Sequence, residues 1–183
     1  MKNEYPIRKN LRLKDYDYSQ NGAYFITMCT DSKKWLFGRY NVGAIHESPV
    51  RFTKDKCISL NKNGKICDKY IKQIPNNYSA VKVVNYIIMP NHIHLLLLFD
   101  GEPIRAIRES PLQRSLLSKV VGRLKMNISK EIHRQNNSDE KIWQRGYNER
   151  IIRNQREFEN AWNYIEYNAL KEYSKGERNE RHL

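Results

Sequence analysis

The chain has 183 residues, of which 33 are Lys or Arg and 20 are Asp or Glu, so its formal net charge is +13. Hydrophobic residues make up 39% and aromatic residues 11%, which is too much apolar side chain for a disordered basic tail. No apolar run approaches the roughly 20 residues that a membrane helix needs. We therefore expect one folded, water-soluble domain with a polyanionic partner, and nucleic acid is the first candidate.

The ends of the chain and its cysteines lead to further expectations. Residues 1–19 are basic and contain no apolar signal segment, which favours a cytoplasmic location. We expect residues 20–173 to form the domain and the charged residues 174–183 to form a flexible tail. The three cysteines include no CxxC pair and are odd in number, so free thiols are expected rather than a disulfide framework or a zinc site.

The first half of the chain predicts two extended segments and a helix. Residues 23–30 are rich in β-branched and aromatic side chains and follow an Asn-Gly turn signal, so they predict a strand. A short extended segment is expected around residues 35–40. Residues 65–74 repeat Ile and Tyr at helical spacing and predict an amphipathic helix that Pro75 ends.

The most apolar stretch, residues 81–99, predicts two strands in the middle of a sheet. A Met-Pro-Asn sequence at residues 89–91 interrupts it, and proline lacks the N–H that a strand interior needs. Apolar residues then follow the helical period from Leu116 to Ile132, with lysines and arginines between them. They predict a long helix, followed by a loop at residues 135–140.

The last part of the chain predicts a short strand and a helix. The strand is expected at Ile151 and Ile152. Asn154 with Glu157 three residues later resembles a capping box, which opens a helix to about Tyr173. Elsewhere, a near repeat of AIHESPV at residues 44–50 and AIRESPL at residues 106–112 is expected to lie in loops, and we hypothesise that it was inserted there.

Two histidines lie in the apolar strand segment. Side chains alternate along a strand, so His92 and His94 project from the same face while Ile93 points to the other. Two imidazoles placed in this way can share a metal ion, and they can equally form only local hydrogen bonds.

The last helix supplies the other candidate residues. With Phe158, Ala161, Trp162, Ile165 and Ala169 on its core face, Tyr164 and Asn168 become neighbours one turn apart on another stripe. Without the histidines, this pair would be read as an ordinary surface tyrosine and a polar helix position.

Three blocks of sequence together resemble a known family. They are YIIMPNHIHLLLLF at residues 86–99, IWQRGYNERIIRN at 142–154 and NYIEYNALK at 163–171. The chain resembles the REP-associated tyrosine transposases, which are relatives of the IS200-like single-tyrosine HUH transposases. The resemblance implies an α+β, ferredoxin-like domain with an antiparallel sheet, helices packed on one face, and a C-terminal helix that carries the nucleophile.

The resemblance also assigns roles to residues. His92 and His94 would bind a metal ion, Asn168 would be a third ligand, and Tyr164 would be the nucleophile. Ala169 departs from the family pattern, in which a proline commonly follows the asparagine, so the end of the helix is left open. Two imidazoles and one amide oxygen suit Mg²⁺ or Mn²⁺ better than a structural zinc ion.

The implied reaction is metal-dependent cleavage and strand transfer on single-stranded DNA with hairpin or palindromic structure. The cation would act as a Lewis acid on the scissile phosphate, and Tyr164 would form a covalent 5′-phosphotyrosine intermediate. The protein would act as a monomer or a homodimer.

A basic stretch is expected to bind the DNA. Residues 104–156 contain 13 Lys or Arg and 5 Asp or Glu, which suits contacts to phosphates, and interleaved aromatic rings could stack on unpaired bases. The alternative is a solvated basic face with Trp143 in the core. The candidates for DNA contact are Lys119, Arg123, Lys125, Trp143, Arg145, Tyr147, Arg150 and Arg153.

Two other functions are compatible with the same residues. One is a non-catalytic, domesticated protein that binds single-stranded nucleic acid on the same fold. The other is a metal hydrolase that cleaves a phosphodiester through water and tolerates Tyr164→Phe. Only the tyrosine mechanism produces a covalent protein–DNA adduct.

Overall fold

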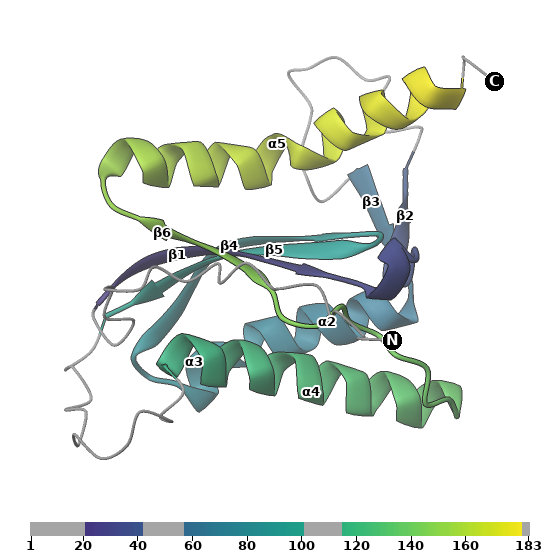
Figure 1. Ribbon diagram of the computed structural model, residues 1–183, viewed down its shortest axis with the longest axis horizontal. Helices are drawn as coiled ribbons and strands as arrows, with labels where there is room; N and C mark the ends of the chain where they lie inside the picture. Colours follow the sequence, from purple (N-terminus) through teal and green to yellow (C-terminus); the bar gives the residue numbers. More distant parts are fainter. Residues whose placement is uncertain (1–20, 42–56, 101–114, 181–183) are drawn as a thin grey trace, which may run out of the picture.

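A four-stranded antiparallel sheet lies at the centre of the protein (Figure 1). The computed structural model describes residues 21–41, 57–100 and 115–180. In spatial order the strands are β4 (Val81–Met89), β5 (His92–Phe99), β1 (Gly22–Cys29) and β6 (Asn148–Ile152). Every neighbouring pair runs antiparallel, which places β5 and β1 in the interior of the sheet.

The connections identify the fold. Helix α2 (Lys62–Lys72) lies between β1 and β4 in the chain, and α4 (Leu116–Asn136) lies between β5 and β6. Numbered along this β-α-β-β-α-β unit, the strands occur in the spatial order 2-3-1-4, which is the ferredoxin-like arrangement. The predicted fold class is therefore confirmed.

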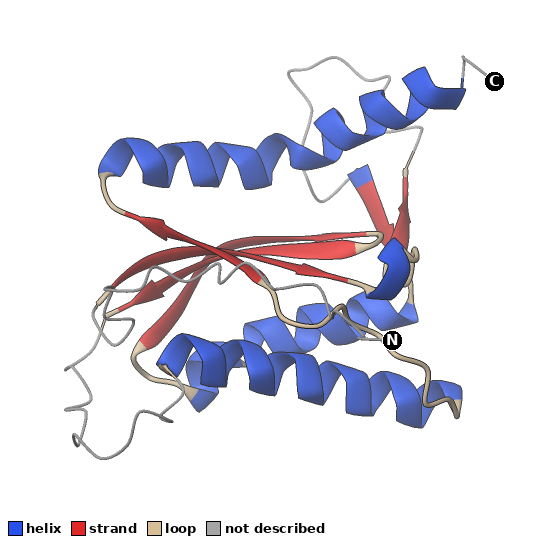
Figure 2. Ribbon diagram, in the orientation of Figure 1, coloured by secondary structure: helices blue, strands red, loops and turns tan. Residues whose placement is uncertain are grey.

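Helices α2 and α4 cover one face of the sheet, and α5 (Gln155–Glu180) lies along the other (Figure 2). The predicted apolar stripe of α4 is buried against the strands. Its buried members are Leu117, Val120, Val121, Leu124, Ile128 and Ile132. Burial of this stripe is the main force that holds α4 to the sheet, because its propensity alone would stabilise it weakly.

Helix α5 approaches the opposite face closely because small side chains line its contact. Ala161, Ile165 and Ala169 are buried, and they form one cluster with Leu96 of β5 and Ile87 of β4. Asn154 begins the helix as predicted. The Glu157 backbone N–H donates to Asn154 Oδ1 (2.9 Å), and a Glu157 carboxylate oxygen accepts from the Arg153 N–H (3.1 Å).

Two expectations for α5 are wrong. Trp162 was placed on the core face, but it is 38% exposed and its ring stacks beside Phe158, because the narrow contact made by the alanines leaves Trp162 at its rim. The helix was expected to end near Tyr173, yet it continues to Glu180. Residues 174–180 contain Gly176, which disfavours a helix, but no proline, and Lys175, Glu177 and Arg178 are good helix formers.

Several element boundaries differ from the sequence prediction. Helix α2 starts at Lys62 rather than Lys65, because Asn61 Oδ1 caps it by accepting from the Gly64 N–H (3.0 Å). Helix α2 ends at Lys72, before the predicted end at Ile74, and Pro75 lies in the first turn of a short helix α3 (Ile74–Asn77), a position that needs no N–H donor. Helix α4 continues to Asn136 and ends at Asn137, which has a left-handed backbone conformation.

A second, two-stranded sheet was only half predicted. The extended segment around residues 35–40 is β2 (Gly38–Tyr40), and it pairs with β3 (Ile58–Leu60), which the sequence analysis did not identify. The hairpin formed by β4 and β5 is confirmed, with Pro90 and Asn91 in its turn.

The remaining sequence expectations concern termini, repeats and thiols. The segment at residues 1–19 and both copies of the near repeat lie outside the described residues. Cys29, Cys57 and Cys67 are present as thiols, and no disulfide joins them. In the described ranges, no helix has the length and apolar character required to cross a membrane.

Candidate active site

The two histidines of β5 lie side by side on the face of the sheet that α5 covers. Their rings are T-shaped to one another, with centroids 4.6 Å apart, and the two Nε2 atoms are separated by 3.0 Å. Both side chains are buried, with 8% of His92 and 4% of His94 exposed. The strand alternation read from the sequence therefore places both ring nitrogens where one bound ion could be shared.

Neighbouring polar groups hold the other nitrogen of each ring. Asn91 Oδ1 lies 2.6 Å from His92 Nδ1, and an amide oxygen only accepts, so this nitrogen bears the proton. His92 Nε2 is then the unprotonated nitrogen of the ring, and it faces His94 Nε2. Thr27 Oγ1 lies 2.9 Å from His94 Nδ1, across the β1–β5 pair in which Thr27 is opposite His94. Such partners orient imidazoles as metal ligands.

His94 is held in its neutral form. Burial, together with a smaller effect of the adjacent His92, lowers the pKa of His94 from 6.5 to about 3. Near neutral pH His94 is therefore uncharged. A metal ion binds only to an uncharged imidazole, because the charged form has a proton on both nitrogens.

Tyr164 of α5 lies directly against this pair. Its ring meets the His94 ring edge to face, with centroids 5.1 Å apart, and 38% of the side chain is exposed. Phe25 of β1 completes the cluster, since it stacks on His94 at 5.2 Å and contacts Tyr164 edge-on at 5.6 Å. Phe25 was not predicted as a site residue. Strand alternation nevertheless places it on the same face of β1 as Thr27.

A cavity of about 320 Å³ opens at the cluster. Its walls come from the end of β1, the residues after it, the turn before β5, and α5. The lining residues are Thr27, Cys29, Lys33, Asn91, His92, His94 and Tyr164. The predicted nucleophile and both predicted imidazoles thus share one pocket, and all three come from a single chain. Lys33, Thr27 and Asn91 were not singled out from the sequence.

The predicted third ligand, Asn168, has a different setting. It is only 2% exposed, and its Nδ2 atom has no hydrogen-bond partner. The unpartnered Nδ2 is an N–H donor, so a cation could be bound only by the Oδ1 atom of this side chain. Asn168 is not among the residues that line the cavity. The described residues contain no group of three or more His, Cys, Asp or Glu that could hold a metal ion.

The donor set fits a divalent cation. Two buried imidazoles, one of them with a strongly lowered pKa, have Nε2 atoms 3.0 Å apart, so both nitrogens could bind one ion. A site with few protein ligands leaves coordination positions for phosphate oxygens, as Mg²⁺ and Mn²⁺ sites require.

A buried hydrogen bond fixes α5 on the sheet near the pocket. Asn85 of β4, itself only 5% exposed, lies at a register shift in the strand and donates from Nδ2 to Glu166 Oε1 of α5 (2.8 Å). Asn85 Oδ1 also accepts from the Tyr86 N–H (2.9 Å). Glu166 is two residues from both Tyr164 and Asn168, so this contact sets the rotation of the helix segment that carries them.

The predicted DNA-contact residues fall into two groups. Five are exposed cations whose side chains can reach solvent and a phosphate. They are Lys119, Arg123, Arg145, Arg150 and Arg153. The other three, Lys125, Trp143 and Tyr147, are engaged within the fold.

Trp143 is not available for stacking on a base. It is buried in the core against Phe37, with ring centroids 5.2 Å apart, and its indole N–H donates to the Lys125 carbonyl (3.2 Å). Lys125 Nζ in turn donates to the carbonyls of Gln144 (2.8 Å) and Gly146 (2.7 Å), and burial lowers its pKa. The expectation of a stacking tryptophan here is therefore wrong, and the core alternative is correct.

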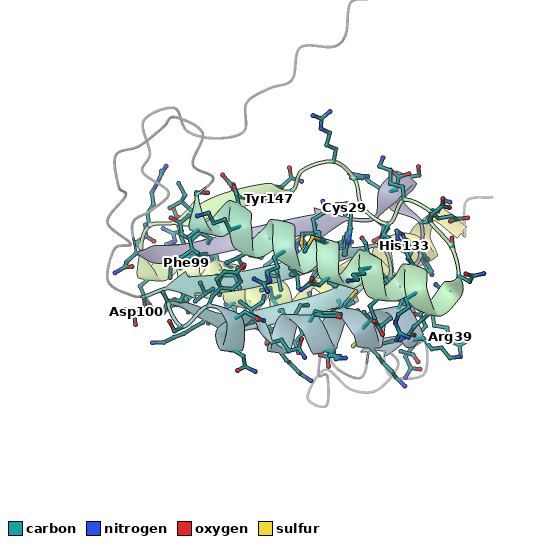
Figure 3. All side chains as sticks on the ribbon, turned by 90° about the horizontal axis from the view of Figure 1, so that it is seen from below. Cys29, Arg39, Phe99, Asp100, His133 and Tyr147 are labelled. Carbon is teal, nitrogen blue, oxygen red and sulfur yellow. The ribbon has the colours of Figure 1, made fainter. Side chains whose placement is uncertain are left out.

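Tyr147 lies beside α4 (Figure 3) and is half-buried, with its hydroxyl 3.2 Å from Ser118 Oγ. Its ring packs against the same core cluster as Trp143. These three residues stabilise the segment between α4 and β6.

Comparison with known proteins identifies the family. The model of the IS200-like transposase family matches residues 50–168, a range that includes both histidines, Tyr164 and Asn168. The chain belongs to the IS200-like transposases.

Two relatives of this transposase extend the comparison. An uncharacterized protein of Haemophilus influenzae is 28% identical over 174 residues, covering 89% of this chain and 88% of that protein. The solved structure of a REP-associated tyrosine transposase bound to a REP hairpin matches with a TM-score of 0.55 at 14% identity, covering 88% of this chain and 74% of that one. At this identity the structural likeness shows a shared fold.

Proposed function

We propose that this transposase is a divalent-metal-dependent endonuclease and strand transferase of the REP-associated type. Its substrate would be single-stranded DNA with hairpin or palindromic structure, and the reaction would pass through a covalent 5′-phosphotyrosine. The observation that carries the proposal is the contact between Tyr164 and His94 within one pocket. The net charge of +13 and the exposed cations of α4 and β6 support a nucleic-acid partner.

The residues of the chain have distinct roles in this proposal. The Tyr164 oxygen attacks the scissile phosphorus, loses its proton and forms an ester bond, while the bond from phosphorus to the 3′-oxygen breaks and that oxygen takes up one proton to leave as a 3′-hydroxyl. Phe25 and His94 hold the Tyr164 ring at its edge and so restrict where the hydroxyl points. Because the ester retains the energy of the broken bond, a second 3′-hydroxyl can reverse the step, which gives strand transfer.

His92 and His94 would hold the cation, with Asn168 proposed as a further ligand. When bound, Mg²⁺ or Mn²⁺ supplies Lewis-acid stabilisation of charge on the non-bridging phosphate oxygens. Asn91 and Thr27 keep the two rings oriented for that task. Since Tyr164 meets His94 of its own chain, we also propose that one chain completes an active site, whatever its oligomeric state.

Cleavage of a labelled hairpin oligonucleotide tests the proposal. Wild-type protein should cut it with Mg²⁺ or Mn²⁺ and not in EDTA, and Tyr164→Phe should bind the DNA without cutting. Tyr167→Phe is the matched control, because Tyr167 lies one turn away on the same helix and is 52% exposed. Cleavage by Tyr164→Phe would favour hydrolysis through water, and DNA binding without cleavage by the wild type would favour a non-catalytic binding protein.

A further inference from the structure

The segment between β1 and β2 is attached to the active-site turn at both ends. At its start the Thr30 N–H donates to the Asn91 carbonyl (2.9 Å), and at its end the Leu36 N–H donates to the Pro90 carbonyl (2.9 Å). Pro90 and Asn91 directly precede His92. Residues 31–35 therefore have a fixed position beside the pocket, and Figure 1 shows this segment at the end of the sheet where the β4–β5 turn lies.

Two consecutive residues of this segment have strained backbones. Ser32 has φ 52° and Lys33 has φ 53°, and neither is glycine. The left-handed conformation costs about 1–2 kcal/mol for a residue with a Cβ. Such strain is retained chiefly where it serves a site. Here it coincides with the placement of Lys33 in the wall of the pocket that contains Tyr164 and both histidines.

An exposed tryptophan follows two residues later. Trp35 is 60% exposed, and its ring meets Tyr40 of β2 edge to face with centroids 5.5 Å apart. Tyr40 thus supports the indole while most of it remains open to solvent. Adjacent residues are about 3.8 Å apart along the chain, so Trp35 lies within reach of a nucleotide next to one held at Lys33. Lys34, between them, forms an exposed ion pair with Glu140 (3.5 Å), so Lys33 is the cation assigned to the DNA.

This inference rests on the proposed function and extends it to the DNA beside the cleavage point. We propose that residues 33–35 bind the single strand next to the scissile phosphate, with Lys33 contacting a phosphate and Trp35 stacking on an unpaired base. An exposed indole gains by covering its face with a base, and this contact tolerates any base because each presents a π-face. The left-handed backbone at Ser32 and Lys33 places the Lys33 side chain in the wall of the pocket, whereas the Trp35 ring lies outside it.

The three tryptophans of the chain make this measurable. A Tyr164→Phe, Trp162→Phe protein cannot form the adduct, and Trp35 is its only exposed tryptophan, since Trp143 is buried. Saturating this protein with oligo(dT) should quench Trp35 emission. Saturation with an abasic oligomer of the same length, which offers phosphates without bases, should leave the emission unchanged.

Affinities in the Tyr164→Phe background separate the two contacts. Trp35→Ala should weaken oligo(dT) binding by about five- to a hundredfold and leave abasic binding unaltered. Lys33→Gln should weaken both by the same factor. Met126→Ala is the control, because Met126 is equally exposed but lies on α4, across the sheet from the pocket, and both affinities should stay constant.

Saturation by oligo(dT) without quenching, or an equal loss of abasic binding in Trp35→Ala, would overturn the inference. The quenching measurement needs no Trp35 variant, so it decides the matter even where Trp35→Ala fails to fold. The proposed function is tested separately by adduct formation in the wild type. An adduct without quenching leaves the catalytic proposal standing, and quenching without an adduct leaves a single-strand-binding surface without the tyrosine chemistry.

Discussion

Burial of His94 makes the stability of the metal-free protein depend on pH in a calculable way. In the unfolded chain His94 takes up a proton near its ordinary pKa of 6.5, whereas in the folded protein it remains neutral down to about 3. Below pH 6.5 the unfolded state therefore binds one more proton than the folded state, so lowering the pH destabilises the fold. Between about pH 7.5 and about pH 5 this one residue should account for a loss of about 2 kcal/mol.

The assay compares wild type with His94→Gln in EDTA, so that no metal ion competes with the proton. Glutamine does not titrate, and every carboxylate and the other histidines are common to both proteins, so their effects cancel in the difference. Urea unfolding at several pH values should show that the wild type loses about 2 kcal/mol more than the variant across this range. In melting temperature the excess loss should be about 4–8 °C for a chain of this size.

Parallel pH dependences in the two proteins would refute this reasoning. They would mean that His94 takes up a proton in the folded state as readily as in the unfolded one. His94 would then not be held in the neutral form that a cation requires.

Three further predictions concern whether one chain forms the whole active site, how Asn85 positions α5, and how tightly two glycines are packed. Mixing His94→Gln with Tyr164→Phe should give no cleavage, because each chain builds its own pocket; restored cleavage would mean that the tyrosine acts on a partner's histidines. Asn85→Ala should cost about 1–3 kcal/mol of stability and reduce cleavage by more than it reduces oligo(dT) binding, and an equal loss of both would remove its positioning role. Gly64→Ala should destabilise the fold, because the added Cβ would lie 2.1 Å from the Phe37 carbonyl oxygen. Gly122→Ala, where the added Cβ meets nothing within 4 Å, should raise stability by about 0.5–1 kcal/mol. Equal shifts in melting temperature for the two variants would contradict this packing.

The parts of the site that the sequence predicted are those that local periodicity determines. Alternation along an apolar strand placed His92 and His94 on one face, and the helical period placed Tyr164 one turn from Asn168. The resemblance to tyrosine transposases then related the strand to the helix. In the ferredoxin-like fold α2 and α4 cover one face of the sheet. The other face, which carries the two histidines, is therefore the one on which α5 packs.

The residues that the prediction missed are those that meet only in three dimensions. Lys33 enters the pocket because two left-handed residues and hydrogen bonds to the β4–β5 turn place it there, and no periodic pattern indicates this. Trp143 was misplaced for the complementary reason. Aromatic residues interleaved with arginines look the same in a sequence whether the ring lies outside or, as here, in the core against Phe37.

The exposure of Trp162 also differs from the prediction. Trp162 satisfies the helical pattern for a core residue, but alanines bring the α5 backbone too close to the sheet for a large ring to fit between them. Trp35 lies in no regular pattern, and its exposure follows from a turn that the sequence did not reveal. Binary patterning identifies the face of an element, whereas the spacing between elements decides which large side chains that face accommodates.

The identity of the residue joined to DNA tests the central claim most directly. Wild-type protein is allowed to react with a hairpin oligonucleotide and digested with trypsin, and the DNA-bearing peptide is sequenced by mass spectrometry. The peptide from Glu157 to Lys171 contains both Tyr164 and Tyr167, so fragmentation within it distinguishes them. The expected product is a nucleotide esterified to Tyr164. A nucleotide on Tyr167 or on another residue, or cleaved DNA with no adduct at all, would contradict it.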